Sequence, residues 1–224
     1  NKDLDEAFNL IDKVIEILGD DIKSVQYKYY KGNLYSYKGE IDKAKEEFEK
    51  IIKDTKDIDD WLYQRISEFY YNYAENKDDY KKSLEYLEKI KDKKTSIYNL
   101  MIFVNYELKN YKKIVEICEE FLNRFLSLNN NKDFENVEEN NIYYIRFIYA
   151  YSLQMIGSNN YDLIVENYKI CLNDETLDKA LIYRSIAKIM MYNMDYKYYL
   201  EGIENLKLSM QLNDALSYYL YAKE

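Results

Sequence analysis

The segment from Tyr29 to Ile52 constrains the fold more than any other part of the sequence, because small residues, aromatic residues and a turn recur in it at helical intervals. Gly32 is followed three residues later by Tyr35, and Ala44 is followed four residues later by Phe48. A small residue inside a helix lets a second helix approach closely, although glycine costs a helix about 1 kcal/mol relative to alanine. Between the two pairs, the sequence Lys-Gly-Glu-Ile-Asp supplies a helix stop and a helix start. The segment therefore predicts two antiparallel helices joined in a hairpin.

These two pairs, Gly-x-x-Tyr and Ala-x-x-x-Phe, resemble the tetratricopeptide repeat, a helix-turn-helix unit of about 34 residues. The resemblance implies an all-α fold, a right-handed superhelix in which successive hairpins stack side by side. It also implies binding of proteins or peptides rather than catalysis. A generic α-solenoid is the alternative architecture.

Composition agrees with an all-α fold. The 224 residues include no proline and only five glycines, so long helices are permitted almost everywhere. No apolar run approaches the roughly 18 to 20 residues of a membrane span. The formal charge of −9 repels phosphate groups. We therefore expect a cytoplasmic protein that acts neither at a membrane nor, through this region, on nucleic acid.

We expect a single solenoid, built from a leading half repeat, five hairpins and a capping helix. The later hairpins are recognised from helix length, turn position and the tyrosine that opens each second helix, at Tyr80, Tyr111, Tyr161 and Tyr196. An extended turn is expected over Glu75–Asp79. The expected boundaries are a half repeat at 1–19, repeats at 22–57, 60–92 and 96–126, a polar loop at 127–141, repeats at 142–173 and 177–212, and a capping helix at 214–224.

Two segments leave alternatives open. The half repeat at 1–19 has the apolar stripe of a second helix without the first helix that would pack on it. We favour a fragment of a longer protein, and the alternative is that something else covers the stripe. The segment 127–141 is rich in Asn and acidic residues, and reads as a surface loop. It is either a plain connector or a flap over a groove.

The sequence lacks the residues and motifs that form the active sites of common enzymes. It contains no histidine, which excludes the usual catalytic triads and most zinc sites. It also contains no glycine-rich phosphate loop and no paired cysteine motif. Cys118 and Cys171 lie on apolar helix faces, so we expect buried, unpaired thiols. The sequence predicts no enzyme, no cofactor and no metal site.

The family places every first helix of a repeat on the concave wall of the superhelix, so the resemblance implies a peptide-binding groove lined by first helices. The side chains expected to face it combine amides, aromatic rings and charged groups. They are Tyr29, Asn33, Tyr37, Arg65, Glu68, Asn72, Asn99, Phe103, Tyr106, Tyr144, Phe147, Tyr151, Arg184 and Lys188, with Met191 also on this face.

Two residue types in this set suggest how a peptide is held. The carboxamides of Asn33, Asn72 and Asn99 can each donate to and accept from an extended backbone. Arg65 and Arg184 can each bind a carboxylate of the peptide through two parallel hydrogen bonds. The alternatives are exposed asparagines without a role, and arginines paired inside the protein with an acid such as Glu68.

Two narrower resemblances bear on the ligand. The tetratricopeptide family often binds C-terminal carboxylates through a Lys and Asn arrangement, and Asn33 matches its Asn, but Tyr29 stands at the place of its Lys. The chain is also similar to peptide-sensing regulators of Gram-positive bacteria and their phages, which carry such repeats, often behind a DNA-binding domain.

The sequence thus predicts a non-enzymatic scaffold that binds a peptide or an extended protein segment along its groove. Two alternatives remain. The chain is the sensor region of a transcription regulator whose DNA-binding domain precedes residue 1, or it is an assembly module that forms a homodimer.

Overall fold

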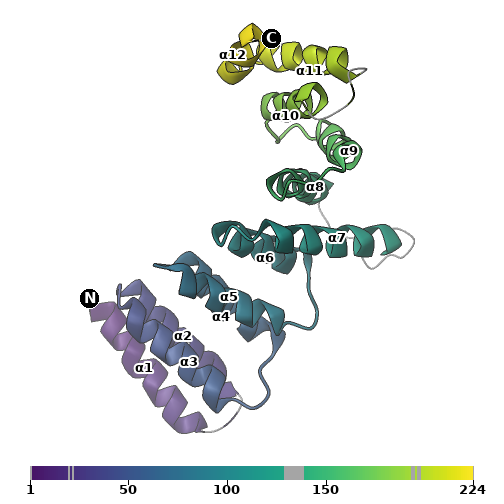
Figure 1. The fold of residues 1–224 in the computed structure, drawn as a ribbon. Coiled ribbons are helices and arrows are strands. Elements are labelled where there is room, and N and C mark those ends of the chain that lie inside the picture. Colours follow the sequence, from purple (N-terminus) through teal and green to yellow (C-terminus); the bar gives the residue numbers. More distant parts are fainter. Residues whose placement is uncertain are drawn as a thin grey trace. The chain divides into compact units, whose positions relative to one another are not determined.

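The structure is a computed structural model that describes residues 2–19, 21, 23–128, 139–192, 195 and 198–223. In these residues every regular element is helical, and no strand occurs, which confirms the all-α expectation (Figure 1). No described helix is long and apolar enough to cross a membrane. The helices are α1 (Lys2–Leu18), α2 (Lys23–Tyr37), α3 (Ile41–Asp54), α4 (Asp60–Asn72), α5 (Lys77–Glu88), α6 (Thr95–Glu107), α7 (Tyr111–Leu128), α8 (Glu139–Met155), α9 (Tyr161–Cys171), α10 (Lys179–Tyr192), α11 (Tyr199–Gln211) and α12 (Ala215–Lys223).

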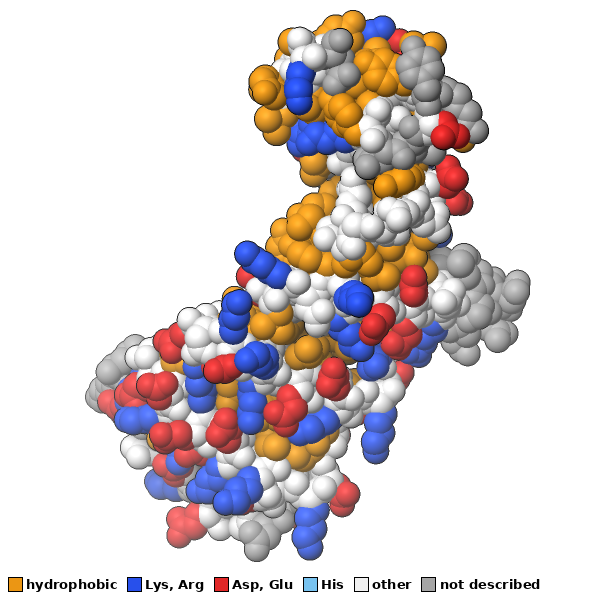
Figure 2. Space-filling view, in the orientation of Figure 1, with side chains coloured by type: hydrophobic (Ala, Val, Ile, Leu, Met, Phe, Trp, Pro, Cys, Tyr) orange, Lys and Arg blue, Asp and Glu red, His pale blue; other side chains and the backbone are white. Residues whose placement is uncertain are grey.

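The chain divides into two compact units, here called unit 1 (Asn1–Asp92) and unit 2 (Lys93–Glu224). Unit 1 contains α1 to α5, and unit 2 contains α6 to α12. In the view of Figure 2, charged side chains are dense over unit 1, whereas hydrophobic side chains gather over unit 2 from α8 to α12. A single uninterrupted solenoid over 1–224 stays a prediction.

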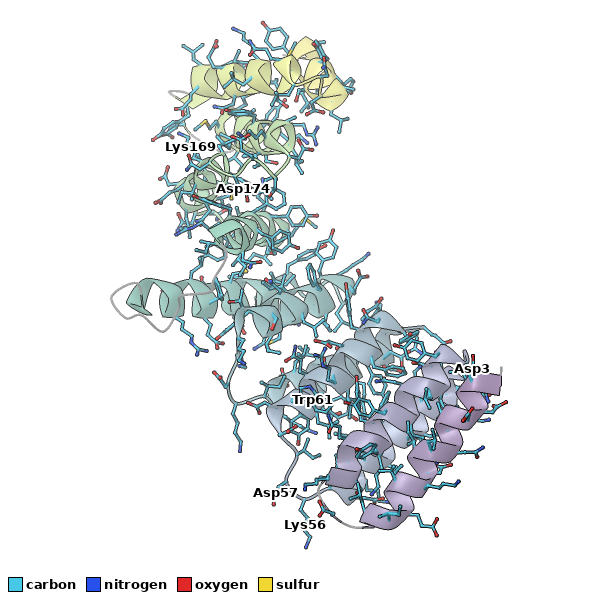
Figure 3. The ribbon with its side chains drawn as sticks, turned by 180° about the vertical axis from the view of Figure 1, so that it is seen from behind. Asp3, Lys56, Asp57, Trp61, Lys169 and Asp174 are labelled. Atoms are coloured by element: carbon cyan, nitrogen blue, oxygen red, sulfur yellow. The ribbon has the colours of Figure 1, made fainter. Side chains whose placement is uncertain are left out.

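In unit 1, α1 packs against α2, α2 against α3, and α4 against α5. Helix α1 lies against α2 (Figure 1), where the rings of Phe8 and Tyr35 are 4.7 Å apart. Trp61, in the first turn of α4 (Figure 3), meets the Tyr29 ring of α2 edge-on at 5.1 Å. Helix α2 therefore covers Phe8 of the apolar stripe, whereas Leu10 and Ile17, which lie outside the stripe, are exposed.

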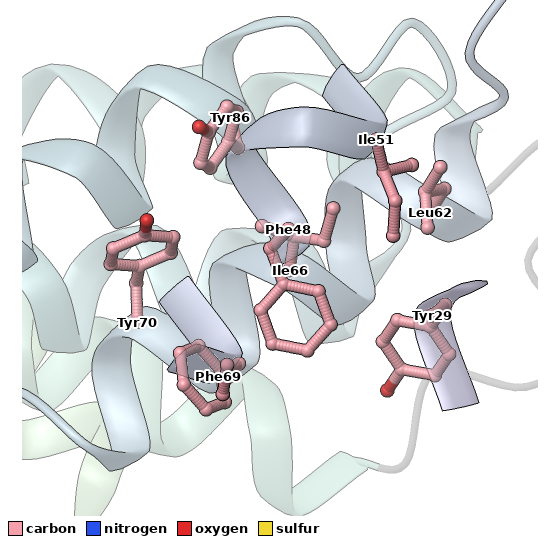
Figure 4. Close-up of a cluster of buried hydrophobic side chains, with 9 residues drawn as sticks. Tyr29, Phe48, Ile51, Leu62, Ile66, Phe69, Tyr70 and Tyr86 are labelled. Atoms are coloured by element: carbon pink, nitrogen blue, oxygen red, sulfur yellow. The ribbon is translucent and has the colours of Figure 1, made fainter. Parts of the chain in front are cut away.

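The core of unit 1 is centred on Phe48 (Figure 4). Its ring lies 5.6 Å from that of Tyr29 and 4.6 Å from that of Phe69, so α2, α3 and α4 meet at this side chain. Gly32 is buried opposite it, and a Cβ atom added at Gly32 would lie 2.4 Å from Phe48 Cε1. The close helix approach predicted from the small residue Gly32 is therefore confirmed.

The second hairpin of unit 1 uses two serines where the first uses Gly32 and Ala44. Ser67 Oγ lies 2.8 Å from Ser83 Oγ, and each hydroxyl also donates to the other residue's carbonyl oxygen, at 3.0 and 2.9 Å. Ser67 belongs to α4 and Ser83 to α5, so the two serines join the helices of this hairpin. Small hydroxyl side chains allow the same close approach as glycine because they satisfy each other when buried.

The expected turn over Glu75–Asp79 is wrong in its second half, since α5 begins at Lys77. The Asn76 side chain accepts hydrogen bonds from the backbone N–H groups of Asp78 and Asp79, at 2.8 and 3.3 Å, and so caps the helix. Asx residues favour this position because they satisfy N–H groups that lack helical partners. Asn76 is thus a helix cap, and Lys77, Asp78 and Asp79 belong to the first turn of α5.

The limits of the expected 127–141 loop also change. Helix α7 continues to Leu128 and α8 begins at Glu139, so both ends of the segment are helical, and 129–138 lie outside the described residues. Tyr111 and Tyr161 open α7 and α9 as predicted, whereas Tyr196 is not among the described residues and α11 begins at Tyr199.

In unit 2, the third hairpin is packed despite its large residues. Ile102 and Ile114, which stand where the repeat pattern prefers small residues, are both buried. Helices α10 and α11 approach each other closely, since a Cβ atom at Gly202 would lie 2.6 Å from Met191 Cγ and 3.2 Å from the Ala187 carbonyl oxygen. Gly202 thus takes the small-residue role in α11, which the sequence analysis did not identify.

The two cysteines are free and buried, as predicted. Burial raises the pKa of the Cys171 thiol to about 12, with a further effect from the Asp174 charge, and it raises that of Cys118 as well. Both thiols remain protonated near neutral pH and act as small apolar side chains.

Candidate functional site

A pocket of about 660 Å³ lies within unit 2 and is here called the unit 2 pocket. Three helices line it, namely α6, α8 and α10, which are the first helices of the successive hairpins in this unit. Its wall consists of Ile102, Phe103, Tyr106, Glu107, Tyr144, Phe147, Ile148, Tyr151, Gln154, Leu181, Arg184, Ser185 and Lys188.

Aromatic rings form most of one side. The Phe103 ring of α6 lies 6.0 Å from the Tyr144 ring of α8. Farther along the same two helices, the rings of Tyr106 and Tyr151 are 6.4 Å apart, and Tyr111 of α7 lies edge-on to Tyr151 at 6.1 Å. Burial raises the pKa of the Tyr151 phenol, and the nearby phenols of Tyr106 and Tyr111 raise it further. The Tyr151 hydroxyl therefore stays protonated as a hydrogen-bond donor and acceptor.

Two polar side chains of the unit 2 pocket, Gln154 and Ser185, are held in place by hydrogen bonds. The hydroxyl of Tyr168 donates to Gln154 Oε1 at 2.6 Å, which orients the Gln154 carboxamide. Ser185 donates to the Leu181 carbonyl oxygen at 2.9 Å. Such fixed polar groups in an apolar cavity are typical of sites that orient a ligand.

The charged groups of the pocket differ in how they are paired. The Arg184 guanidinium forms an ion pair with Asp214, and the two side chains are 15% and 11% exposed. Lys188 lies one helical turn beyond Arg184 on α10, and Glu107 lies at the end of α6. Within the described part of the chain, neither Lys188 nor Glu107 forms an ion pair.

The pocket brings together seven residues of the predicted groove, from all three first helices of unit 2: Phe103, Tyr106, Tyr144, Phe147, Tyr151, Arg184 and Lys188. The sequence missed Ile102, Glu107, Ile148, Gln154, Leu181 and Ser185. Each is three or four residues from a predicted groove residue, so the i+3 and i+4 spacing of a helix face could have identified them.

Arg184 forms an ion pair inside the protein. It was predicted as an anchor for a ligand carboxylate, with an internal ion pair as the alternative. The structure shows the internal pair, but with Asp214 at the start of α12 rather than with an acid of its own helix. The pairing depends on how α10 and α12 pack, because 30 residues separate the two side chains in the chain.

Asn99 lies near the pocket without lining it. Its Nδ2 donates to Asn141 Oδ1 at 3.4 Å, between α6 and α8. Its own Oδ1 is buried, and no described residue hydrogen-bonds to it. Asn99 therefore joins two helices of the wall.

In unit 1, Tyr29 is a core residue rather than a groove residue. Its side chain is 9% exposed and packs against Phe48 and Trp61. Burial raises the pKa of its phenol, and hydrogen bonding to Asn33 together with the positive charge of Arg65 opposes this rise. The ring packs against α3 and α4, and its hydroxyl hydrogen-bonds with Asn33 of α2.

The other predicted residues of unit 1 are accessible. Tyr37 and Asn72 are exposed, and Asn33 is half-buried. Arg65 Nη1 donates to Glu68 Oε2 at 2.8 Å, so the alternative of an internal ion pair is confirmed for this arginine. Both partners lie on α4, and the exposed pair contributes little to stability.

The structure offers no evident site for a metal. Among the described residues, no group of three or more Cys, Asp or Glu side chains is placed to hold an ion.

Comparisons with known proteins give structural matches alone. No protein-family model matches the chain, and no curated protein matches it. A solved structure titled "YrrB: a TPR protein with an unusual peptide-binding site" matches with a TM-score of 0.59 and 16% identity, over 96% of this chain and 98% of that one. The structure from the functional characterization of pilF of Pseudomonas aeruginosa matches with a TM-score of 0.53 and 15% identity, over 100% and 91% of the two chains.

BtubC from P. vanneervenii matches with a TM-score of 0.52 and 13% identity, over 95% of this chain and 91% of that chain. At such identities the likeness concerns the fold. Together with the repeated hairpins and the small-residue contacts at Gly32 and Ser67, it shows that this chain has the fold of the tetratricopeptide-repeat proteins.

Proposed function

We propose that the chain is a non-enzymatic helical-repeat scaffold that binds a peptide or an extended protein segment in the unit 2 pocket. The observation that carries the proposal is the pocket itself, with a volume of about 660 Å³ and a wall drawn from α6, α8 and α10. Ligand sites in proteins span roughly 300 to 1,000 Å³ and are mostly apolar, with a few convergent polar groups.

The chemistry of the wall supports a peptide as the ligand. Phe103, Phe147 and the tyrosines offer apolar surface for bulky side chains. The phenols of Tyr106 and Tyr151 and the carboxamide of Gln154 can hydrogen-bond to a peptide backbone, which presents donors and acceptors alternately. One protein of similar fold is titled as having a peptide-binding site, which is consistent with this proposal.

A random peptide library, selected on the immobilised protein, would test the proposal. We expect selected peptides to lose about 2 kcal/mol or more of binding free energy, roughly 30-fold in affinity, on the substitution Phe103→Ala. The matched control is Tyr73→Ala in unit 1, because Phe103 and Tyr73 are both 38% exposed. Isothermal titration would measure both variants, and far-UV circular dichroism would verify that they fold. Equal losses of binding free energy in the two variants, or no loss in either, would show that the peptide does not bind in the unit 2 pocket.

A second candidate function is self-association. Helix α12 favours it, since its large apolar side chains Leu216, Tyr218, Tyr219 and Tyr221 are exposed. Exposed apolar patches often mark protein interfaces. Size-exclusion chromatography with light scattering tests this candidate, and a monomer at high protein concentration would count against it.

A further inference from the structure

Arg184 is shared between the unit 2 pocket and α12. Its side chain lines the pocket from α10, whereas its partner Asp214 is not part of the pocket wall. The guanidinium of Arg184 therefore stands between the proposed peptide site and the start of the last helix. A guanidinium carries five N–H donors, and Asp214 accepts from the Nη1 group.

Asp214 holds the start of α12 in place. Its Oδ1 accepts from the backbone N–H of Leu216 at 3.2 Å. Its Oδ2 accepts from the hydroxyl of Ser217 at 2.8 Å and from that of Ser209 in α11 at 3.0 Å. Burial alone would raise the pKa of the Asp214 carboxyl, but the hydroxyls of Ser217 and Ser209 and the charge of Arg184 outweigh it, so the pKa lies below its usual value. The carboxylate is thus ionised in the docked helix.

Few other contacts anchor α12. Ser217 is the one buried residue of this helix, and most of its large apolar side chains are exposed. The helix has nine residues, and isolated helices shorter than about 12 to 15 residues are marginal in water. Its docked position consequently depends on the polar cluster of Asp214, Ser217, Ser209 and Arg184.

We propose that a carboxylate of a bound peptide competes with Asp214 for Arg184, so that an acidic ligand in the unit 2 pocket loosens α12. This inference rests on the proposed function, and it adds both the chemistry of the ligand and its effect on the protein. The exchange replaces one carboxylate by another on the same guanidinium, so its free-energy change is small. The positive charge of Lys188 favours binding of the acidic ligand. Lys188 also lines the pocket, lies one helical turn from Arg184 and has no ion pair in the described structure.

The competition is reciprocal. If docking of α12 weakens binding of an acidic peptide by a given factor, binding of that peptide weakens docking of α12 by the same factor. Two independent measurements, one on the ligand and one on the helix, must therefore agree.

The affinity test uses a peptide selected from the random library and the full 224-residue chain. It compares the acidic peptide with a matched form, in which each Asp or Glu is replaced by its amide and the C-terminus is amidated. We expect Asp214→Asn to raise the affinity for the acidic form by about 5-fold or more, within the usual range of coupling between sites. The same variant should leave the affinity for the amide form unchanged. Arg184→Gln should abolish the preference for the acidic form.

A second variant separates helix release from a simple change of charge. Ser217→Ala removes a hydrogen bond to Asp214 and leaves every charge in place. It should also raise the affinity for the acidic peptide. It serves as the test should Asp214→Asn fail to fold.

The helix itself supplies the other readout. Amide hydrogen exchange in residues 215–223 should become faster when the acidic peptide binds and should stay unchanged with the amide form. Equal affinity of wild type and both variants for the acidic peptide, or unchanged exchange in α12, would overturn this inference.

The outcomes distinguish the two proposals. Peptides that depend on Phe103 but show no preference for the acidic form would overturn the competition at Arg184 and leave peptide binding intact. A library that yields no peptide dependent on the unit 2 pocket would overturn both.

Discussion

At the scale of single residues, two side chains explain how the first hairpin closes. Gly32 lacks a Cβ atom at the point where Phe48 approaches its backbone, and Phe48 is completely buried. Because the Phe48 ring is enclosed by Tyr29 and Phe69, it cannot move aside for a larger residue at Gly32.

We expect Gly32→Leu to lower the free energy of unfolding by about 1 to 3 kcal/mol through overpacking, and Phe48→Ala to lower it by about 3 to 5 kcal/mol through a cavity. The double variant should lose less than the sum, because the leucine fills part of the space that Phe48 leaves. Urea denaturation of the four proteins measures this cycle. Strict additivity would mean that the two residues do not pack on each other.

Asp79 should make the stability of unit 1 depend on pH. Its carboxylate pairs with Lys45 at 2.8 Å and accepts from the Glu75 backbone N–H at 2.9 Å, with 9% of the side chain exposed. Burial alone would raise the pKa of this carboxyl, but the hydrogen bonds from Lys45 and from the backbone outweigh it and hold the pKa below its usual value. Its stabilisation is therefore present above the unfolded pKa of about 3.9 and is lost as pH falls through the lower folded pKa.

We expect Asp79→Asn to cost about 1.5 to 3 kcal/mol near neutral pH, as for hydrogen bonds to charged groups, and to cost less as the medium becomes more acidic than the folded pKa. The control is Asp78→Asn, because the exposed Asp78 pairs only with Lys81 on the surface. Urea denaturation at several pH values measures both. A constant difference between wild type and Asp79→Asn at all pH values would contradict the assignment.

At the scale of elements, helix starts are decided by capping rather than by apolar spacing. Asn76 caps α5 with two hydrogen bonds, whereas Glu40, in the same place before α3, makes no side-chain capping bond. The two positions differ because an Asn side chain is short enough to reach the N–H groups of the next turn.

Asn76→Ala should therefore lower the free energy of unfolding by about 0.5 to 2 kcal/mol. Glu40→Ala is the matched control and should change it by less, since it removes only a surface ion pair with Lys43. Thermal melts followed by far-UV circular dichroism measure the two losses. Similar losses would show that the cap does not fix the start of α5.

At the scale of the whole molecule, each unit has buried aromatic residues of its own. Phe48 and Phe69 belong to unit 1, and Phe121 and Tyr168 belong to unit 2. Trp61, the one tryptophan of the sequence, lies in unit 1 and packs on its core. Its fluorescence therefore reports the unfolding of unit 1.

We expect Phe121→Ala, which costs about 3 to 5 kcal/mol in a core, to shift the denaturation curve seen by circular dichroism and to leave that of Trp61 fluorescence almost unchanged. Phe48→Ala should shift the fluorescence curve. Repeat proteins depart from two-state unfolding when local contacts dominate. Coincident shifts of both curves in both variants would show that the chain unfolds as one unit.

The sequence by itself determined the all-α architecture, the hairpins and the face of α6, α8 and α10 that lines the unit 2 pocket. These features follow from spacing along a helix, which places residues three or four apart on one face whatever packs against it. Phe103, Tyr106 and Tyr151 are accordingly expected on one face from their spacing alone, and all three line the unit 2 pocket.

Only the tertiary structure decided which polar group each charged side chain meets and which aromatic residue is buried. Arg184 forms an ion pair with Asp214, which directly precedes α12. Tyr29 is buried in the core beside Phe48, and Ser67 takes the place of a glycine opposite Ser83. Helix spacing cannot predict these outcomes, because the partners come from other helices and the burial of a side chain depends on the volume those helices leave between them.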